Sequence, residues 1–159
     1  MLAALVRSAT LDDAEAITAL INSSFRKAEE FFISEDRIDC AGVRNFFAMG
    51  TFLLAEREGA IVGCVYVEPR AEARAYLGLL AIDLTRQQSG LGSLLMDAAE
   101  DYCRGLGRLF MDINVVNLRL ELPAFYQKRG YMKTGMTSPF PDDVKTKIPC
   151  HFFEMSKPL

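Results

Sequence analysis

The stretch Gln87-Gln88-Ser89-Gly90-Leu91-Gly92 lies between two segments whose hydrophobic patterns differ. The apolar residues 76–82 that precede it predict a buried strand. Gly105 and Gly107 supply a helix stop further on. Between the stretch and that stop, apolar residues recur at every third or fourth position, as on one face of a helix: Leu91, Leu94, Leu95, Ala98, Ala99, Tyr102 and Cys103. The pattern therefore predicts a strand, a glycine-containing turn and a helix in succession.

A turn of this kind can bind an anion. The first N–H groups of a helix have no partner within the helix, and the helix dipole favours negative charge in front of them. Glycine lacks the Cβ atom that would keep a phosphate away from the backbone. The first acidic residue of the predicted helix is Asp97, and Arg86 adds a positive charge nearby. The stretch predicts a site for a phosphate-bearing ligand, although an ordinary strand-to-helix turn would use the same glycines.

Composition narrows the class of protein. The chain has 159 residues, of which 50% are apolar, so residues 1–159 are expected to form one domain with a sizeable core. The net charge of −3 provides no general attraction to nucleic acid or to an anionic membrane, and no apolar run is long enough to span a bilayer. The chain has one histidine and no C-x-x-C pair, so no metal site is expected. Free thiols are typical of a cytoplasmic protein; the four are Cys40, Cys64, Cys103 and Cys150.

The remaining pattern predicts a mixture of strands and helices with one crossover, which is an α/β (α+β) arrangement. Strands are expected over residues 4–9, 51–58, 61–68, 75–83, 108–115, 130–135 and 150–155. Helices are expected after Thr10 through Phe25, over residues 40–49, from Leu91 to Cys103, and over residues 118–128. Residues 26–39 are expected to form a partly ordered loop or a short helix, and residues 137–149 a loop.

The order of these elements resembles the GCN5-related N-acetyltransferase (GNAT) superfamily over nearly the whole chain. Three blocks carry the resemblance: residues 77–82, the turn Gln87-x-x-Gly90-x-Gly92, and Phe125-Tyr126-Gln127-Lys128-Arg129-Gly130-Tyr131. It implies a mixed, mostly antiparallel central sheet that is flanked by helices and whose central strands splay apart. It also implies acetyl-CoA as the cosubstrate and, as the acceptor, a primary amine of a small molecule, an amino acid or a peptide. A homodimer is one possible assembly.

The resemblance also implies roles for individual residues. The pantetheine arm of the cofactor would lie along the backbone of Leu80, Ala81 and Ile82, as an added strand does. Asn117 would contact the pantetheine or the thioester, and Tyr126 would lie beside the sulfur. Main-chain N–H groups would hold the pyrophosphate over the stretch Gln87, Gln88, Ser89, Gly90, Leu91, Gly92 and Ser93.

Acetyl transfer to an amine requires a neutral nucleophile, a polarised thioester carbonyl and a hydrogen-bond donor for the departing sulfur. A tyrosine hydroxyl is protonated at neutral pH and can be that donor, which suits Tyr126. The same residue could instead be a core aromatic, since Phe125 and Tyr131 lie close to it in the sequence. Histidine at position 151 could act through its imidazole or be structural. The base stays open; the candidates are Glu29, Glu30, Glu68 and Glu72.

Two other functions were weighed against acetyl transfer. A non-catalytic module that senses or docks acyl-CoA would use the same turn without turnover. A dinucleotide-binding Rossmann site is disfavoured, because the G-x-G pattern lacks its third glycine and no acidic residue closes the next strand. The sequence does not identify the acceptor.

Overall fold

Seven strands form one continuous sheet in the order β1-β2-β3-β4-β5-β7-β6. The computed structural model describes residues 3–86 and 89–159, so the predicted cofactor residues Gln87 and Gln88 lie outside the described residues. Every neighbouring pair of strands is antiparallel except β4 and β5, which are parallel. The strands are β1 Leu5–Ser8, β2 Thr51–Arg57, β3 Ala60–Arg70, β4 Arg74–Ile82, β5 Phe110–Val116, β6 Met132–Pro139 and β7 His151–Pro158. This α+β arrangement confirms the predicted fold class.

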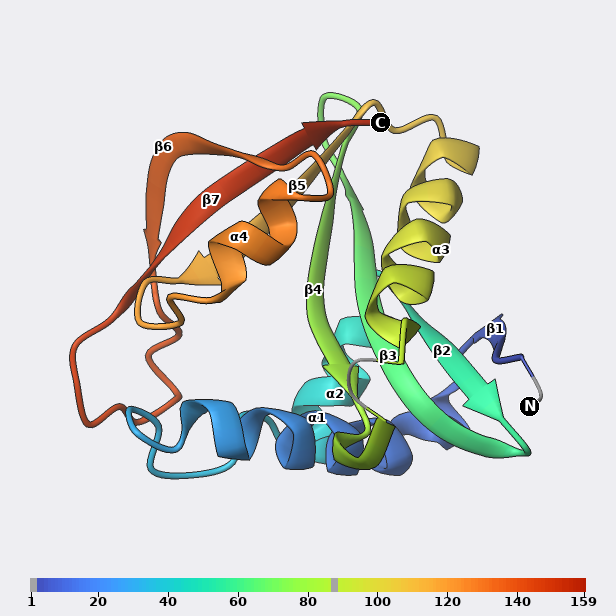
Figure 1. Cartoon of the computed structure of the whole chain (residues 1–159), viewed down its shortest axis with the longest axis horizontal. Coiled ribbons are helices and arrows are strands. Elements are labelled where there is room, and N and C mark those ends of the chain that lie inside the picture. Colours follow the sequence, from blue (N-terminus) through green and yellow to red (C-terminus); the bar gives the residue numbers. More distant parts are fainter. Residues whose placement is uncertain (1–2, 87–88) are drawn as a thin grey trace.

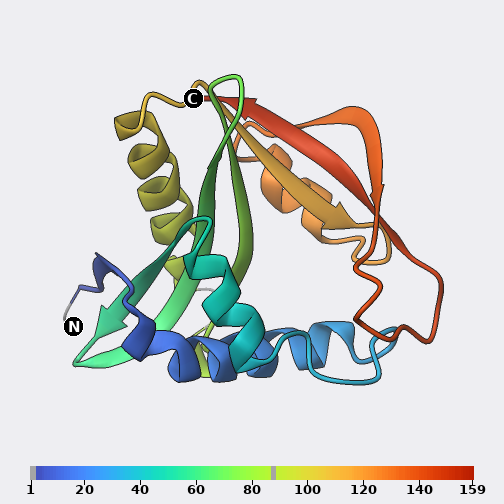
Figure 2. The same ribbon diagram turned by 180° about the vertical axis from the view of Figure 1, so that it is seen from behind.

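Helices cover both faces of the sheet (Figures 1 and 2). They are α1 Ala14–Glu29, α2 Cys40–Phe47, α3 Leu91–Gly105 and α4 Leu122–Gln127, with short 3-10 turns at Leu11–Asp13 and Leu84–Arg86. Along β2, Leu53 and Ala55 pack in the cluster that includes α3, whereas Phe52 and Leu54 pack in the cluster beneath α1 and α2. This alternation shows that the two sets of helices lie on opposite faces, which is why β2 is apolar at both odd and even positions.

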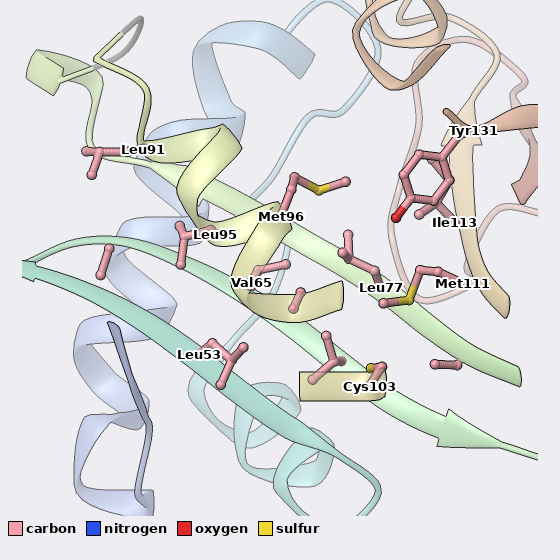
Figure 3. Close-up of a cluster of buried hydrophobic side chains, with 14 of the residues drawn as sticks. Leu53, Val65, Leu77, Leu91, Leu95, Met96, Cys103, Met111, Ile113 and Tyr131 are labelled. Carbon is pink, nitrogen blue, oxygen red and sulfur yellow. The ribbon is translucent and has the colours of Figure 1, made fainter. Parts of the chain in front are cut away.

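Helix α3 is the crossover connection between β4 and β5, and it packs closely on the sheet. Figure 3 shows Leu95 and Met96 of this helix in one buried cluster with Val65 and Leu77 of the strands. A Cβ atom on Gly63 of β3 would come within 2.8 Å of a Leu95 methyl group. The absence of that atom lets the helix lie close to β3, and the start of the helix is thereby held beside the end of β4.

Several boundaries differ from the sequence-based expectation. Helix α1 continues to Glu29 and so includes residues that were expected in the following loop. Helix α4 begins only at Leu122 instead of residue 118, because Pro123 is compatible with the first turn of a helix and not with its interior. Strand β6 runs to Pro139, since its pairing with β7 extends into the segment expected to be a loop.

Strands β4 and β5 are adjacent over only part of their length. They pair from Arg74 opposite Phe110 to Leu77 opposite Ile113, and no further pairs follow. Strand β5 pairs with β7 along its whole length, and beyond Ile113 that half of the sheet diverges from β4 to leave a wedge between β4 and α4 (Figure 1). Helix α1 and the loop between β6 and β7 lie across the open end of the wedge. The predicted splaying of the central strands is therefore confirmed.

A buried carboxylate ties α3 to the half of the sheet that contains β7. Glu100 is 3% exposed, and its Oε2 atom accepts a hydrogen bond from the Tyr131 hydroxyl at 3.0 Å. Lys157 Nζ on β7 donates to Oε1 of the same carboxylate at 2.6 Å. A buried charge of this kind requires its partners, because the interior solvates it poorly.

We expect Lys157→Met to lower the free energy of unfolding by about 2 kcal/mol, since it removes a charged hydrogen-bond donor from a buried carboxylate. Urea denaturation monitored by circular dichroism measures this change. Lys128→Met is the matched control, because Lys128 is exposed at the end of α4, and it should change stability by less than about 0.5 kcal/mol. Equal stability of the two variants would mean that the contact between Lys157 and Glu100 does not stabilise the fold.

Candidate active site

A cavity of about 530 Å³ lies where β4 and β5 diverge. Its walls come from α1, β4, the first turn of α3, β5, α4 and β7, together with residues from the connections between these elements. Cavities of this size commonly hold small-molecule ligands and cofactors. The wedge in the sheet is therefore the candidate site.

The first turn of α3 lines this cavity with N–H groups that have no acceptor within the helix. The first bond within the helix runs from Leu94 N to Gly90 O at 3.0 Å, so the N–H groups of Leu91, Gly92 and Ser93 have no acceptor in the helix. Among residues 3–86 and 89–159 no side chain caps this end, and the first turn contains no acidic residue. Gly90 adopts a φ of 82°, a conformation that glycine reaches without strain. These four residues line the cavity, as does Arg86, so the predicted anion site faces it.

Ser89 differs from its neighbours in the predicted stretch. Its side chain is exposed, its hydroxyl donates to the Arg86 carbonyl, and it does not line the cavity. This contact closes the turn between the 3-10 segment at Leu84–Arg86 and α3. The residue therefore shapes the turn.

Strand β4 contains a bulge at the mouth of the wedge. Between the pairs Cys64–Ala81 and Tyr66–Gly78, β4 has two residues where β3 has one. One of the two, Leu79, has a φ of 52°, which is strained for a leucine. A bulge bends a strand and increases its twist, and this one lies just past the last residue that pairs with β5. It therefore marks the point at which β4 leaves its neighbour.

Beyond the bulge, β4 has one edge paired with β3 and one edge free. Asp83 N donates to Val62 O on β3 at 2.9 Å. Because successive residues of a strand direct their backbone groups to opposite edges, Leu80 and Ile82 present theirs toward the wedge. Both residues line the cavity. Ala81 does not: its side chain is buried beneath α1, and it pairs with Cys64.

Tyr126 on α4 lines the cavity from the side opposite β4. It packs against Phe125 and Tyr131, with ring centroids 5.1 Å and 5.9 Å away. Burial raises the pKa of Tyr126 to about 12, so its hydroxyl is protonated at neutral pH. Among the described residues, no hydrogen bond from this hydroxyl is found. Tyr126 is thus both a packed aromatic and an available proton donor.

The amide on the cavity wall is Asn114 of β5, which is exposed there, and not Asn117. The Oδ1 atom of Asn117 accepts from His151 N at 2.9 Å, and Asn117 N donates to His151 O at 2.9 Å. These two bonds continue the pairing of β5 with β7. Neither Asn117 nor His151 lines the cavity. The sequence did not distinguish the two asparagines, because that distinction depends on where β5 ends.

Only one of the four candidate bases, Glu29, lines the cavity. Glu68 is engaged on β3, where its carboxylate accepts from the Tyr66 hydroxyl and from Arg70 Nε, each at 2.7 Å. Glu30 and Glu72 are exposed and lie outside the cavity wall. Arg37 and Arg119 also line the cavity; neither was predicted from the sequence, because both lie in irregular segments that carry no periodic signal.

Neither a metal site nor a membrane span is evident in the described residues. No group of three or more His, Cys, Asp or Glu side chains within residues 3–86 and 89–159 is placed to hold a metal ion. None of the helices in these ranges combines the length and the hydropathy that a bilayer-spanning segment requires.

Comparison with known proteins shows a family and a shared fold. The family model described as "Acetyltransferase (GNAT) family" matches residues 14–131. Ard1 from Thermoplasma volcanium is similar in structure, with a TM-score of 0.81, 22% identity, and 99% of each chain covered. PaiA N-acetyltransferase from Thermoplasma acidophilum, solved in complex with coenzyme A, has a TM-score of 0.78 and 17% identity, with 99% of this chain and 100% of that chain covered. Ribosomal-protein-alanine N-acetyltransferase from Brucella melitensis has a TM-score of 0.74 and 21% identity, with 98% and 99% covered. No curated protein matches the chain in sequence.

Proposed function

This chain belongs to the acetyltransferase (GNAT) family, and on that premise we propose that it transfers an acetyl group from acetyl-CoA to a primary amine of a small molecule, an amino acid or a peptide. The observation that carries the proposal is the meeting of three groups at one cavity. These are the free N–H groups at the start of α3, the unpaired edge of β4 and the protonated hydroxyl of Tyr126. Together they match a long ligand with a phosphate at one end and a reactive carbonyl at the other.

The residues that would hold acetyl-CoA follow the wall of the cavity. The N–H groups of Leu91, Gly92 and Ser93 would bind its pyrophosphate, with Arg86 adding positive charge. The free backbone groups of Leu80 and Ile82 would pair with the pantetheine arm as they would with another strand. Past the bulge, one of these N–H groups would also polarise the thioester carbonyl, since a strand holds its donors in place before the reaction begins.

The chemistry then requires few protein groups. Acetyl-CoA supplies the acetyl group: its C–S bond breaks as the C–N bond to the amine forms, and the sulfur leaves as a thiolate. The Tyr126 hydroxyl would donate a proton to that sulfur and regain one from solvent. The amine, which enters as an ammonium ion, loses one proton before attack and a second as the amide forms. One proton is therefore released to solvent for each acetyl group transferred.

Two measurements on the purified protein test this proposal. Titration calorimetry with acetyl-CoA should show one site for each chain. Release of the CoA thiol should accelerate when an amine from a panel of polyamines, amino acids and short peptides is added. If acetyl-CoA binds but no amine accelerates thiol release, the protein is the non-catalytic module considered above. If acetyl-CoA does not bind, the cofactor assignment is wrong.

A further inference from the structure

One end of the cavity contains a cluster of three charged side chains that the steps above do not use. Glu29 is the last residue of α1, Arg37 lies between α1 and α2, and Arg119 lies between β5 and α4. All three line the cavity. They come from both sides of the wedge, and both arginines lie within 3.9 Å of the Glu29 carboxylate.

The carboxylate of Glu29 is buried but incompletely bonded. The residue is 6% exposed. Arg119 Nη1 lies 3.4 Å from Oε2, while Arg37 Nε lies 3.9 Å from Oε1, which accepts no hydrogen bond within the described part of the chain. By contrast, the structural ion pair between Arg119 Nε and Glu121 Oε1 measures 2.7 Å. The contacts to Glu29 are longer than a structural pair needs, so Oε1 is available to another donor.

The burial of Glu29 has a cost that a ligand could offset. Burial raises the pKa of this carboxyl, and the positive charges of Arg37 and Arg119 oppose that shift only partly. A buried carboxylate with an unbonded oxygen is costly to maintain. A cationic donor from a ligand would supply the missing hydrogen bond.

The guanidinium of Arg37 is held in place but has free donors. It lies over the ring of Phe140, 5.0 Å from the centroid, and its side chain is 17% exposed. Within residues 3–86 and 89–159, its only ionic contact is the long one to Glu29, and it makes no side-chain hydrogen bond. Arg119 is different, because Glu121 and Glu29 already engage it. Arg37 is therefore the residue that can receive an anionic group at this end of the cavity.

We propose that Glu29 and Arg37 together bind an acceptor that carries a carboxylate beside its amine, as a free amino acid does. Glu29 Oε1 accepts a hydrogen bond from the ammonium group, and the Arg37 guanidinium holds the carboxylate. The charges explain why both groups are needed: Glu121 and Glu29 engage Arg119, so Glu29 Oε1 and the Arg37 guanidinium remain for a ligand, and an amine alone would contact only the first of them. An acceptor with both charges satisfies each side chain. This inference rests on the proposed function and narrows its acceptor class.

The test compares acceptors that differ only in the carboxylate. Thiol release from acetyl-CoA is measured with the free L-amino acids, with their α-carboxamides, and with putrescine and spermidine. The wild-type protein should have a higher kcat/KM for at least one amino acid than for its carboxamide and for either polyamine. This preference runs against intrinsic reactivity, because the carboxamide has the less basic amine and more of it is neutral at pH 7.

Substitutions then assign the preference to these residues. Arg37→Gln should raise KM for the preferred amino acid by about 10- to 100-fold, as for a lost charge-assisted hydrogen bond, and leave the carboxamide nearly unchanged. Glu29→Gln should lower kcat/KM for both, since both carry the amine. Arg44→Gln and Glu30→Gln are matched controls, because both side chains are exposed and outside this cavity. Binding of acetyl-CoA that calorimetry finds unchanged shows that each variant is folded. If Glu29→Gln does not fold, Glu29→Asp is used in its place.

The outcomes separate this inference from the proposed function. If the carboxamides or the polyamines release thiol as well as any amino acid does, or if Arg37→Gln leaves the ratio of amino acid to carboxamide unchanged, the inference is wrong and acetyl transfer stands. If no amino acid releases thiol from a protein that binds acetyl-CoA, the inference is likewise wrong. If acetyl-CoA does not bind, the proposed function itself fails.

Discussion

Replacing Tyr126 by phenylalanine is expected to lower kcat by about 100-fold or more while the dissociation constant for acetyl-CoA stays within twofold, since general acid catalysis typically contributes at least that factor. The ring remains, so its packing against Phe125 and Tyr131 is preserved. Only the hydroxyl is lost, and no hydrogen bond from it to the described residues has to be broken. A large fall in turnover without a loss of stability would therefore identify the hydroxyl as the proton donor.

Steady-state thiol release at saturating acetyl-CoA measures kcat, and titration calorimetry measures binding. Tyr102→Phe is the matched control: its hydroxyl lies 3.2 Å from Thr51 Oγ1, and it does not line the cavity. That variant should retain wild-type kcat. Wild-type turnover in Tyr126→Phe would assign Tyr126 to core packing alone, which is the alternative that the neighbouring aromatic residues suggest.

Replacing Gly92 by aspartate is expected to weaken acetyl-CoA binding by more than about 100-fold without lowering the melting temperature. A carboxylate about 4 Å from a phosphate costs roughly 4 kcal/mol at an effective dielectric constant of 20, before the second phosphate is counted. The fold should tolerate the side chain, because the nearest atom to a Cβ at this position is Phe125 Cζ at 3.8 Å. An acidic residue in the first turn of a helix also stabilises it by about 0.3–1 kcal/mol. Binding and stability should therefore change in opposite directions.

Two further variants separate charge from size and position. Gly92→Ala adds the Cβ without the charge and should bind acetyl-CoA within a few-fold of the wild type. Gly105→Asp places the same charge at the far end of α3, where a Cβ meets no atom within 4 Å, and should leave binding unchanged. Calorimetry and thermal denaturation of all three variants give the comparison. Binding by Gly92→Asp that equals binding by Gly92→Ala would exclude the start of α3 as the pyrophosphate site.

Much of the fold could be predicted because its signals are local. The succession of β4, turn and α3 is encoded by a short apolar run, by the glycines at the turn and by apolar residues at helical spacing. All of these signals lie within about thirty consecutive residues. The boundaries of α1, α4 and β6 were predicted less well. The ends of these elements depend on packing and strand pairing with distant segments, and the helix and strand propensities of the local residues do not contain that information.

Some features of the candidate site could likewise be predicted from local sequence, whereas others depend on the tertiary structure. By itself the sequence determined the glycine-containing turn, the apolar strand beside it and the tyrosine-containing block. Only the tertiary structure decided that Asn114, and not Asn117, faces the cavity. It also decided that Glu29 and Arg119, which are 90 positions apart, lie within 3.4 Å of one another. The physical reason is that hydrophobic periodicity records which face of an element is buried, whereas the divergence of β4 from β5 determines which polar side chains meet in the space between them.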